Sequence, residues 1–172
     1  MTMTRRLTLS LRLPISVAEC ENKKSLMPSE FRGNPENSVL SELVDISVPA
    51  HLEAIAALVD AISKTLARLE VPEQKRLEVA LAVQEALANA VIHGCGKDPS
   101  KQVRCRVKSD PQGRIVIIVT DPGPGFNPDL LPDPRQHENL HADHGRGVYL
   151  IRQLMDEVQF ERRGGEIRMW KY

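Results

Sequence analysis

The sequence has few aromatic residues, no excess of charge of either sign and no long apolar run. Aromatic residues make up 3% of its 172 residues, so a platform on which single-stranded nucleic acid bases stack is not expected. Lys and Arg together number 23, as do Asp and Glu, and the formal net charge is zero. Since no overall field draws the chain to nucleic acid or to an anionic membrane, partners must be recognised by local sites.

The sequence also lacks membrane and export signals. No apolar run approaches the length of a bilayer-crossing helix. Arg5 and Arg6 precede an apolar stretch as in a signal peptide, but Arg12 and Pro14 interrupt that stretch. The 3 cysteines have neither metal-site nor redox-pair spacing, which favours a reducing compartment. We therefore expect a cytoplasmic protein with no membrane partner and no direct nucleic-acid partner.

Composition divides the chain into a leader and one domain. Between Glu19 and Ser41 the sequence is rich in Ser, Asn, Pro, Glu and Lys and shows no helical or strand periodicity. Such a segment cannot bury enough apolar surface to fold, so residues 1–41 are predicted to be a disordered leader. Residues 42–172 suffice for one domain with a proper core.

The first half of the domain predicts one strand and two helices. Leu43–Val48 alternates like a half-buried strand that Pro49 ends. Apolar residues recur at helical spacing over Leu52–Leu69. A second helix is predicted from Pro72 to about His93, with Gly94 as its C-terminal stop and apolar residues, Leu77 and Leu81 among them, round most of its girth.

The second half predicts a hairpin, a lid, a helix and two short strands. Val103–Val107 and Arg114–Thr120 are predicted to pair, and the second has no polar alternation, so it is expected at the centre of a sheet. Phe126–His144 is long and proline-punctuated, which suggests a functional lid. Helical periodicity resumes over Val148–Val158, and short strands flank Arg163-Gly-Gly165. The expected fold is α+β, with a mixed sheet and helices on one face.

Glu85 and Asn89 lie four residues apart in the second predicted helix and so share one of its faces. Asn89 can offer a neutral oxygen to Mg²⁺, and the Glu85 carboxylate can orient or deprotonate an attacking hydroxyl. Pairs with this spacing are also common on the solvated face of an amphipathic helix. The pair alone therefore leaves both interpretations open.

Asp121-Pro-Gly-Pro-Gly125 follows the most apolar predicted strand. Gly123 and Gly125 carry no Cβ, so a ligand can approach their backbone, and the Asp121 carboxylate can accept a hydrogen bond from an exocyclic amine. This combination suits an adenine ring. A plain turn is the alternative, because Asp, Pro and Gly are the commonest turn residues.

Gly145-Arg146-Gly147 opens the third predicted helix. Backbone N–H groups and the positive end of the helix dipole lie at such a start, where an anion can bind. Arg146 adds a charge that can contact terminal phosphate oxygens. A helix start without a ligand is the alternative.

These motifs resemble, in order and spacing, the successive boxes of the ATPase superfamily that includes gyrase and the histidine kinases. Within it, Glu-Ala-Leu-Ala-Asn-Ala-Val-Ile-His-Gly at residues 85–94, Gly-Phe-Asn-Pro-Asp at 125–129 and Leu-Met-Asp-Glu-Val at 154–158 resemble the anti-sigma-factor serine kinases. The resemblance covers roughly Leu43 to Tyr172. It implies a two-layer α/β sandwich of the Bergerat type that binds ATP and Mg²⁺.

The resemblance also implies roles for individual residues. Glu85 matches the catalytic base, Asn89 the magnesium ligand and Asp121 the adenine-recognising carboxylate. Arg146 matches a phosphate-contacting position, and His93 matches a position near the phosphates, although a satisfied helix-end histidine is the alternative. The glycines that match the family's nucleotide-contacting positions are Gly123, Gly125, Gly145 and Gly147.

The function implied is that of a protein-serine/threonine kinase and anti-sigma factor. Members of this family phosphorylate an anti-sigma-factor antagonist protein, hold a sigma factor inactive and form homodimers. One departure is Gly165-Glu166, where the family commonly has Gly-Thr. A carboxylate near phosphate repels it, so either Glu166 points away or nucleotide affinity is reduced.

Two other functions stay open. A non-catalytic nucleotide-binding module that sequesters a sigma factor or another regulatory partner is favoured by Glu166, whereas an intact Glu85 favours the kinase. An ATP hydrolase like the DNA-maintenance members of the superfamily would need a further domain to transmit closure.

Overall fold

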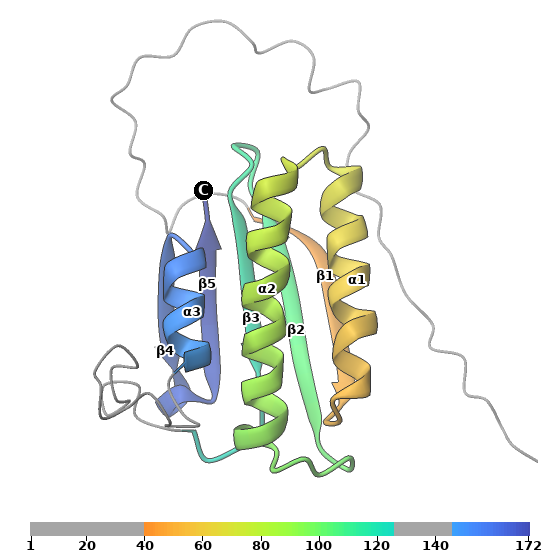
Figure 1. The fold of residues 1–172 in the computed structure, drawn as a ribbon, viewed down its shortest axis with the longest axis vertical. Helices are drawn as coiled ribbons and strands as arrows, with labels where there is room; N and C mark the ends of the chain where they lie inside the picture. The colour runs from red at the N-terminus through yellow and green to blue at the C-terminus, as the bar shows by residue number, and fades with distance from the viewer. Residues whose placement is uncertain (1–39, 126–145) are drawn as a thin grey trace, which may run out of the picture.

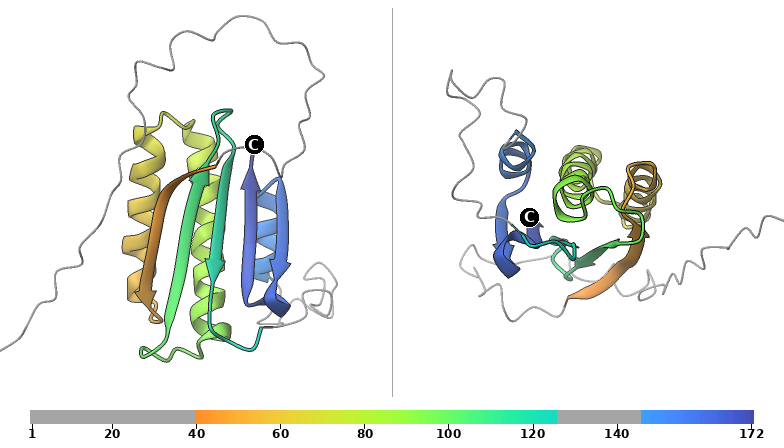
Figure 2. Two further views of the ribbon diagram at one scale, coloured as in Figure 1. Left: turned by 180° about the vertical axis from the view of Figure 1, so that it is seen from behind. Right: turned by 90° about the horizontal axis from the view of Figure 1, so that it is seen from below.

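The structure, a computed structural model, describes residues 40–125 and 146–172. These residues form a five-stranded sheet with α-helices packed side by side over one face (Figure 1). Seen from below, the helices make one layer and the sheet a second (Figure 2). The predicted α+β class and the two-layer sandwich with helices on one face are confirmed.

The strands follow the order β1-β2-β3-β5-β4 across the sheet. Their bounds are Ser41–Pro49 for β1, Gln102–Ser109 for β2, Ile115–Thr120 for β3, Glu157–Glu161 for β4 and Glu166–Lys171 for β5. Neighbouring strands among these are all antiparallel, so the prediction of a mixed sheet was wrong. The connection through a helix does leave β3 and β4 parallel, but β5 lies between them and pairs antiparallel with both.

The helices are α1 (Glu53–Arg68), α2 (Glu73–Asn89) and α3 (Arg146–Leu154). Pro72 directly precedes α2, as expected of a residue with a fixed φ and no N–H. None of the helices that the structure describes has the length and apolar character needed to cross a membrane. Ser41, placed in the predicted leader, begins β1, and residues 1–39 lie outside the described part of the chain.

The outer side of α2 is more exposed than its sequence predicts. Leu77 is 60% exposed and Leu81 39% exposed, so the expectation that apolar residues bury this helix round most of its girth was wrong here. The buried side chains of α2 are Val79, Ala82, Val83, Ala86 and Leu87. Because α1 and α3 flank α2 and the sheet lies beneath it, the side facing away from the sheet is the one that no element within residues 40–125 and 146–172 covers (Figure 2).

The strand β3 lies at the centre of the sheet, as its sequence predicts. Ile115, Ile117 and Val119 belong to the core between sheet and helices. Val116 and Ile118 are buried on the opposite face, with exposures of 3% and 8%. Burial on both faces explains why this strand shows no polar alternation.

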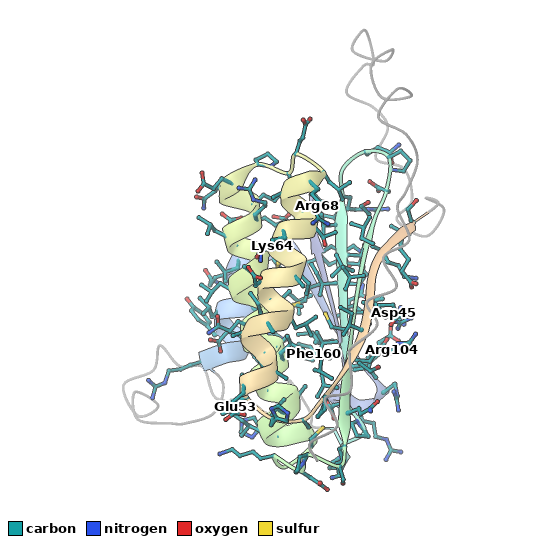
Figure 3. The ribbon with its side chains drawn as sticks, turned by 90° about the vertical axis from the view of Figure 1, so that its right-hand side faces the viewer. Asp45, Glu53, Lys64, Arg68, Arg104 and Phe160 are labelled. Atoms are coloured by element: carbon teal, nitrogen blue, oxygen red, sulfur yellow. The ribbon has the colours of Figure 1, made fainter. Side chains whose placement is uncertain are left out.

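The sheet face away from the helices carries charged side chains in pairs. Arg104 donates from Nε to Oδ1 of Asp45 across β1 and β2, at 2.7 Å. Figure 3 shows this pair on the far side of the sheet from α1, whereas Phe160 lies on the helix side. The two faces of the sheet thus follow the period-two alternation of a strand.

Candidate nucleotide site

The first and third sequence motifs meet where α2 passes the start of α3. A Cβ atom placed on Gly147 would lie 2.9 Å from Oε2 of Glu85 and 3.2 Å from Nδ2 of Asn89. That spacing is too tight for most side chains, so the absence of a Cβ lets α3 begin directly against the carboxylate and the carboxamide. Glu85 and Asn89 are both half-buried at this contact.

The opposite end of α3 is fixed by Lys171 at the end of β5. Its Nζ donates to the carbonyl oxygen of Leu154 at 2.8 Å and lies 2.7 Å from Oε2 of Glu78. A cation at the C-terminal end of a helix also interacts favourably with the helix dipole. These contacts hold α3 alongside α2 and so support the approach of Gly147 to Glu85.

The second motif meets the first through a π-helical turn. The helix α2 continues as Ala90–Gly94, closed by a hydrogen bond from the Cys95 N–H to the Ala90 carbonyl at 2.8 Å. A Cβ on Gly94 would overlap the Asp121 carboxylate, and one on Gly123 would overlap the Gly94 carbonyl oxygen. The turn therefore places the backbone that follows Asn89 in direct contact with the loop that follows β3.

The loop after β3 is held by its own aspartate and by the start of β5. The Gly123 N–H donates to Oδ1 of Asp121 at 2.8 Å, and the Asp121 N–H donates to the Gly165 carbonyl at 3.1 Å. Gly125 has a φ of 75°, and a Cβ there would overlap the Arg163 carbonyl. Only glycine fits this left-handed position without strain.

Burial dominates the electrostatics of Asp121. It raises the pKa of the carboxyl group above its ordinary value, while the Gly123 hydrogen bond and the charges of Arg162 and Lys101 offset part of that increase. The result is a half-buried carboxylate with one oxygen bound within its own loop.

The predicted site residues that the structure describes fall around these contacts. His93 is exposed in the π-helical turn that follows Asn89, and Arg146 is exposed at the first position of α3. Gly145 and the predicted lid, Phe126–His144, lie outside the described residues. The assigned roles of all these residues stay predictions.

Gly94 also belongs to this region, although the sequence pattern predicts it only as the C-terminal stop of a helix. A glycine that ends a helix is ordinary, because its left-handed freedom suits a C-cap. Here the glycine is needed for close approach instead, since any side chain would collide with Asp121. No signal within the helix distinguishes these two uses, because Asp121 is distant in sequence.

Glu166 points away from this region. On β5, Ile167 and Met169 belong to the core beneath the helices. The paired Thr120 and Glu166 lie on the other face, where the Thr120 hydroxyl donates to Oε2 of Glu166 at 3.0 Å. Of the two outcomes expected for this carboxylate, the structure therefore gives the one in which it points away from the region of Glu85, Asn89 and Asp121.

Comparisons with known proteins agree with this architecture. A family model described as the histidine kinase-like ATPase domain matches residues 48–171. A serine-protein kinase RsbW of Bacillus pumilus (strain SAFR-032) is 31% identical over 134 residues, which cover 72% of this chain and 81% of that protein. The serine-protein kinase RsbW of Bacillus subtilis (strain 168) is 29% identical over 139 residues, covering 77% and 86%.

A solved structure shares the fold. It contains the RsbU and RsbW domains of a Mycobacterium tuberculosis protein and matches with a TM-score of 0.50 and 18% identity, over 74% of this chain and 31% of that chain. The chain belongs to the histidine kinase-like ATPase family, and its predicted resemblance to that family is confirmed.

Proposed function

We propose that the protein is a serine/threonine kinase that transfers the γ-phosphate of ATP to a hydroxyl of a partner protein. The observation that carries the proposal is the approach of Gly147 to Glu85 and Asn89. It brings a potential base, a metal ligand and the start of a helix within a few ångströms of one another. Phosphoryl transfer needs positioning and charge neutralisation more than covalent chemistry, and these groups can provide both.

The base of the nucleotide would be recognised at the Asp121 loop. One oxygen of Asp121 accepts the Gly123 N–H, which leaves the other as an acceptor for an exocyclic amine of adenine. Gly94 and Gly123 supply backbone without side chains beside it, and Cβ atoms would overlap neighbouring atoms at both positions. These glycines therefore let the turn and the loop pack directly against the Asp121 carboxylate and fix where it lies.

The phosphates would lie between α2 and the N-terminus of α3. Arg146 and the backbone N–H groups of that N-terminus would contact phosphate oxygens. The oxygen of Asn89 would hold Mg²⁺, an ion that prefers oxygen ligands and keeps several waters. When bound, this ion neutralises charge on the phosphates.

Glu85 would act on the incoming hydroxyl. Its carboxylate lies one helical turn before Asn89 and against Gly147, on the side where the γ-phosphate would end. There it can orient the hydroxyl and accept its proton as the bond to phosphorus forms. Glu85 is the residue whose loss should separate transfer from binding.

The relatives named serine-protein kinase RsbW support a protein substrate. We propose an anti-sigma-factor antagonist as that substrate and a sigma factor as a second partner, bound by a homodimer in the cytoplasm. The alternative of a purely sequestering module rested on Glu166, and a carboxylate on the opposite sheet face gives that alternative no support.

A transfer assay with Glu85→Gln tests the proposal. With labelled ATP, magnesium and the antagonist protein encoded nearest to this chain's gene, the wild type should label the antagonist on serine. The variant should bind ATP as the wild type does while its transfer rate falls by roughly two to four orders of magnitude. Glu73→Gln, an exposed change in the first turn of the same helix, is the control and should transfer normally. Equal transfer by the wild type and Glu85→Gln would remove Glu85 from the reaction.

A further inference from the structure

Glu166 is a carboxylate buried on the sheet face that the helices do not cover. Its side chain is 8% exposed, although charged residues are almost never this buried unless they are paired. The neighbouring Glu161 on β4, which pairs with it across the ladder, is 42% exposed. The burial of Glu166 therefore has a specific cause beyond its place on an outer strand face.

Three side chains from three strands hold this carboxylate. Arg168 of β5 donates from Nε to Oε1 at 2.9 Å, and the Thr120 hydroxyl of β3 donates to Oε2 at 3.0 Å. Arg106 of β2 lies 3.9 Å from Oε2 through its terminal nitrogen. Burial raises the pKa of Glu166, but the bonds from Arg168 and Thr120 outweigh it, and the net pKa is lowered. The group is thus a charged anchor that ties β2, β3 and β5 together.

The anchor lies one residue from the predicted base-recognition loop. Thr120 and Glu166 form the last register pair between β3 and β5. The next residues, Asp121 and Gly165, are joined by the hydrogen bond from the Asp121 N–H to the Gly165 carbonyl at 3.1 Å. Asp121 itself faces the π-helical turn on the helix side, where its carboxylate contacts Gly94.

We propose that Glu166 is a positioning residue that fixes the direction of the Asp121 carboxylate from the opposite face of the sheet. This rests on the proposed function in one respect, namely that Asp121 recognises the amine of adenine. Without the Glu166 anchor, the last register pair of β3 and β5 loses its side-chain hydrogen bond, while the backbone bond from Asp121 to Gly165 remains. The Asp121 backbone then has more freedom, and its carboxylate spends less time aimed at the base.

The test compares Glu166→Gln with Glu161→Gln in the full chain. Both changes remove one negative charge from the same face, and both carboxylates contact Arg168. Glutamine keeps one acceptor oxygen, which can accept from Arg168, but its NH2 group replaces the oxygen that accepts from Thr120, and the charge assistance is lost. Only Glu166→Gln should affect Asp121, because only Glu166 is bonded to Thr120.

The first measurement is the affinity for ATP relative to ITP by calorimetry. Inosine carries a carbonyl oxygen in place of the exocyclic amine and a proton on N1, so ITP loses the contact assigned to Asp121 and keeps the sugar and phosphate contacts. Glu166→Gln should reduce the preference for ATP over ITP by about three- to tenfold, as expected for weakening one hydrogen bond, whereas Glu161→Gln should preserve it. A general loss of structure would weaken both nucleotides equally, and an equal loss would overturn the proposal.

The second measurement needs no nucleotide. Amide hydrogen exchange should be faster at the Asp121 N–H in Glu166→Gln than in the wild type or in Glu161→Gln, because its bond to Gly165 opens more often. Unchanged exchange at Asp121 would contradict the proposed anchor whatever the nucleotide results. In another outcome the wild type prefers ATP over ITP, and Glu166→Gln shows both effects, while the wild type transfers no phosphate to a protein. That result would support the role of Glu166 and refute only the proposed kinase activity.

Discussion

The backbone N–H of Gly123 donates to Oδ1 of Asp121 over 2.8 Å, so one carboxylate oxygen is used to shape the loop that carries it. No other described residue donates a hydrogen bond to this carboxylate. In the proposed site the remaining oxygen is the base-recognition acceptor. In this proposal the Asp121 side chain stabilises its own loop through one oxygen and binds the adenine amine through the other. A mutation can separate these two roles.

Asp121→Asn should separate shape from recognition. The asparagine Oδ1 can still accept the Gly123 N–H, but its Nδ2 then faces the adenine amine as a second donor. The dissociation constant for ATP should rise about ten- to a hundredfold, the cost of an unmade and partly buried hydrogen bond. Calorimetry measures it, with the exposed Asp60→Asn as the control. ATP binding at wild-type strength would show that Asp121 does not contact the base.

The stability of Asp121→Asn has a definite expected sign. Burial raises the pKa of Asp121 in the folded state, so the native protein binds this proton more tightly than the unfolded chain does. The contribution of the carboxyl group to stability is therefore lost as the pH rises through its unfolded and folded pKa values. At neutral pH the neutral asparagine should not lower the melting temperature. A marked decrease would mean that the charge itself stabilises the loop.

The same shift predicts a pH dependence of base selectivity. A protonated Asp121 cannot accept through both oxygens, so the preference for ATP over ITP should decline on acidification. Because the pKa is raised above the ordinary 3.8, the decline should begin at a higher pH than an ordinary aspartate would give. Comparing two triphosphates at each pH cancels the titration of the phosphates. In Asp121→Asn the only variation left should be the one that protonation of the adenine ring itself causes.

The sequence predicted the parts of the site better than their assembly. Glu85 and Asn89 share a helix face because of their spacing, and the apolar Ile115–Val119 is central because both of its faces are buried. The pairing of β5 with β3 and the contact of Gly94 with Asp121 each join segments that are distant in sequence. The periodicity of one segment does not predict which distant segment it contacts.

One side-chain direction that the sequence left open and one expectation that was wrong have a similar explanation. Residues alternate between the two faces of a strand, so the core positions of Ile167 and Met169 place Glu166 on the opposite face. This inference requires knowing that residues 166–169 form a strand and which face is buried. Leu77 and Leu81 appeared to belong to the core because helical periodicity identifies an apolar face without showing whether another element covers it.

Gly94→Ala should damage both stability and ATP binding. The added Cβ overlaps the Asp121 carboxylate, so either the π-helical turn or the loop must move. Overpacking of this kind costs about 1–3 kcal/mol in the free energy of unfolding, which chemical denaturation measures. Gly165→Ala is the matched control, because φ is −80° there and the nearest atom to a Cβ would lie at 3.5 Å. Equal stabilities of the two variants would contradict the close approach at Gly94.

Asn89→Ala should reduce the dependence of ATP binding on magnesium. The carboxamide oxygen is the proposed protein ligand of the ion, and its removal leaves only water and phosphate oxygens. We expect ATP affinity measured with magnesium to fall about tenfold while affinity in EDTA changes little, since losing one hard oxygen ligand affects only the metal-bound form. Gln84→Ala, an exposed change on the same helix, should keep the full magnesium effect. A magnesium effect of wild-type size in Asn89→Ala would place the ion on other ligands, and the contact of Asn89 with Gly147 would then serve only the packing of α3 on α2.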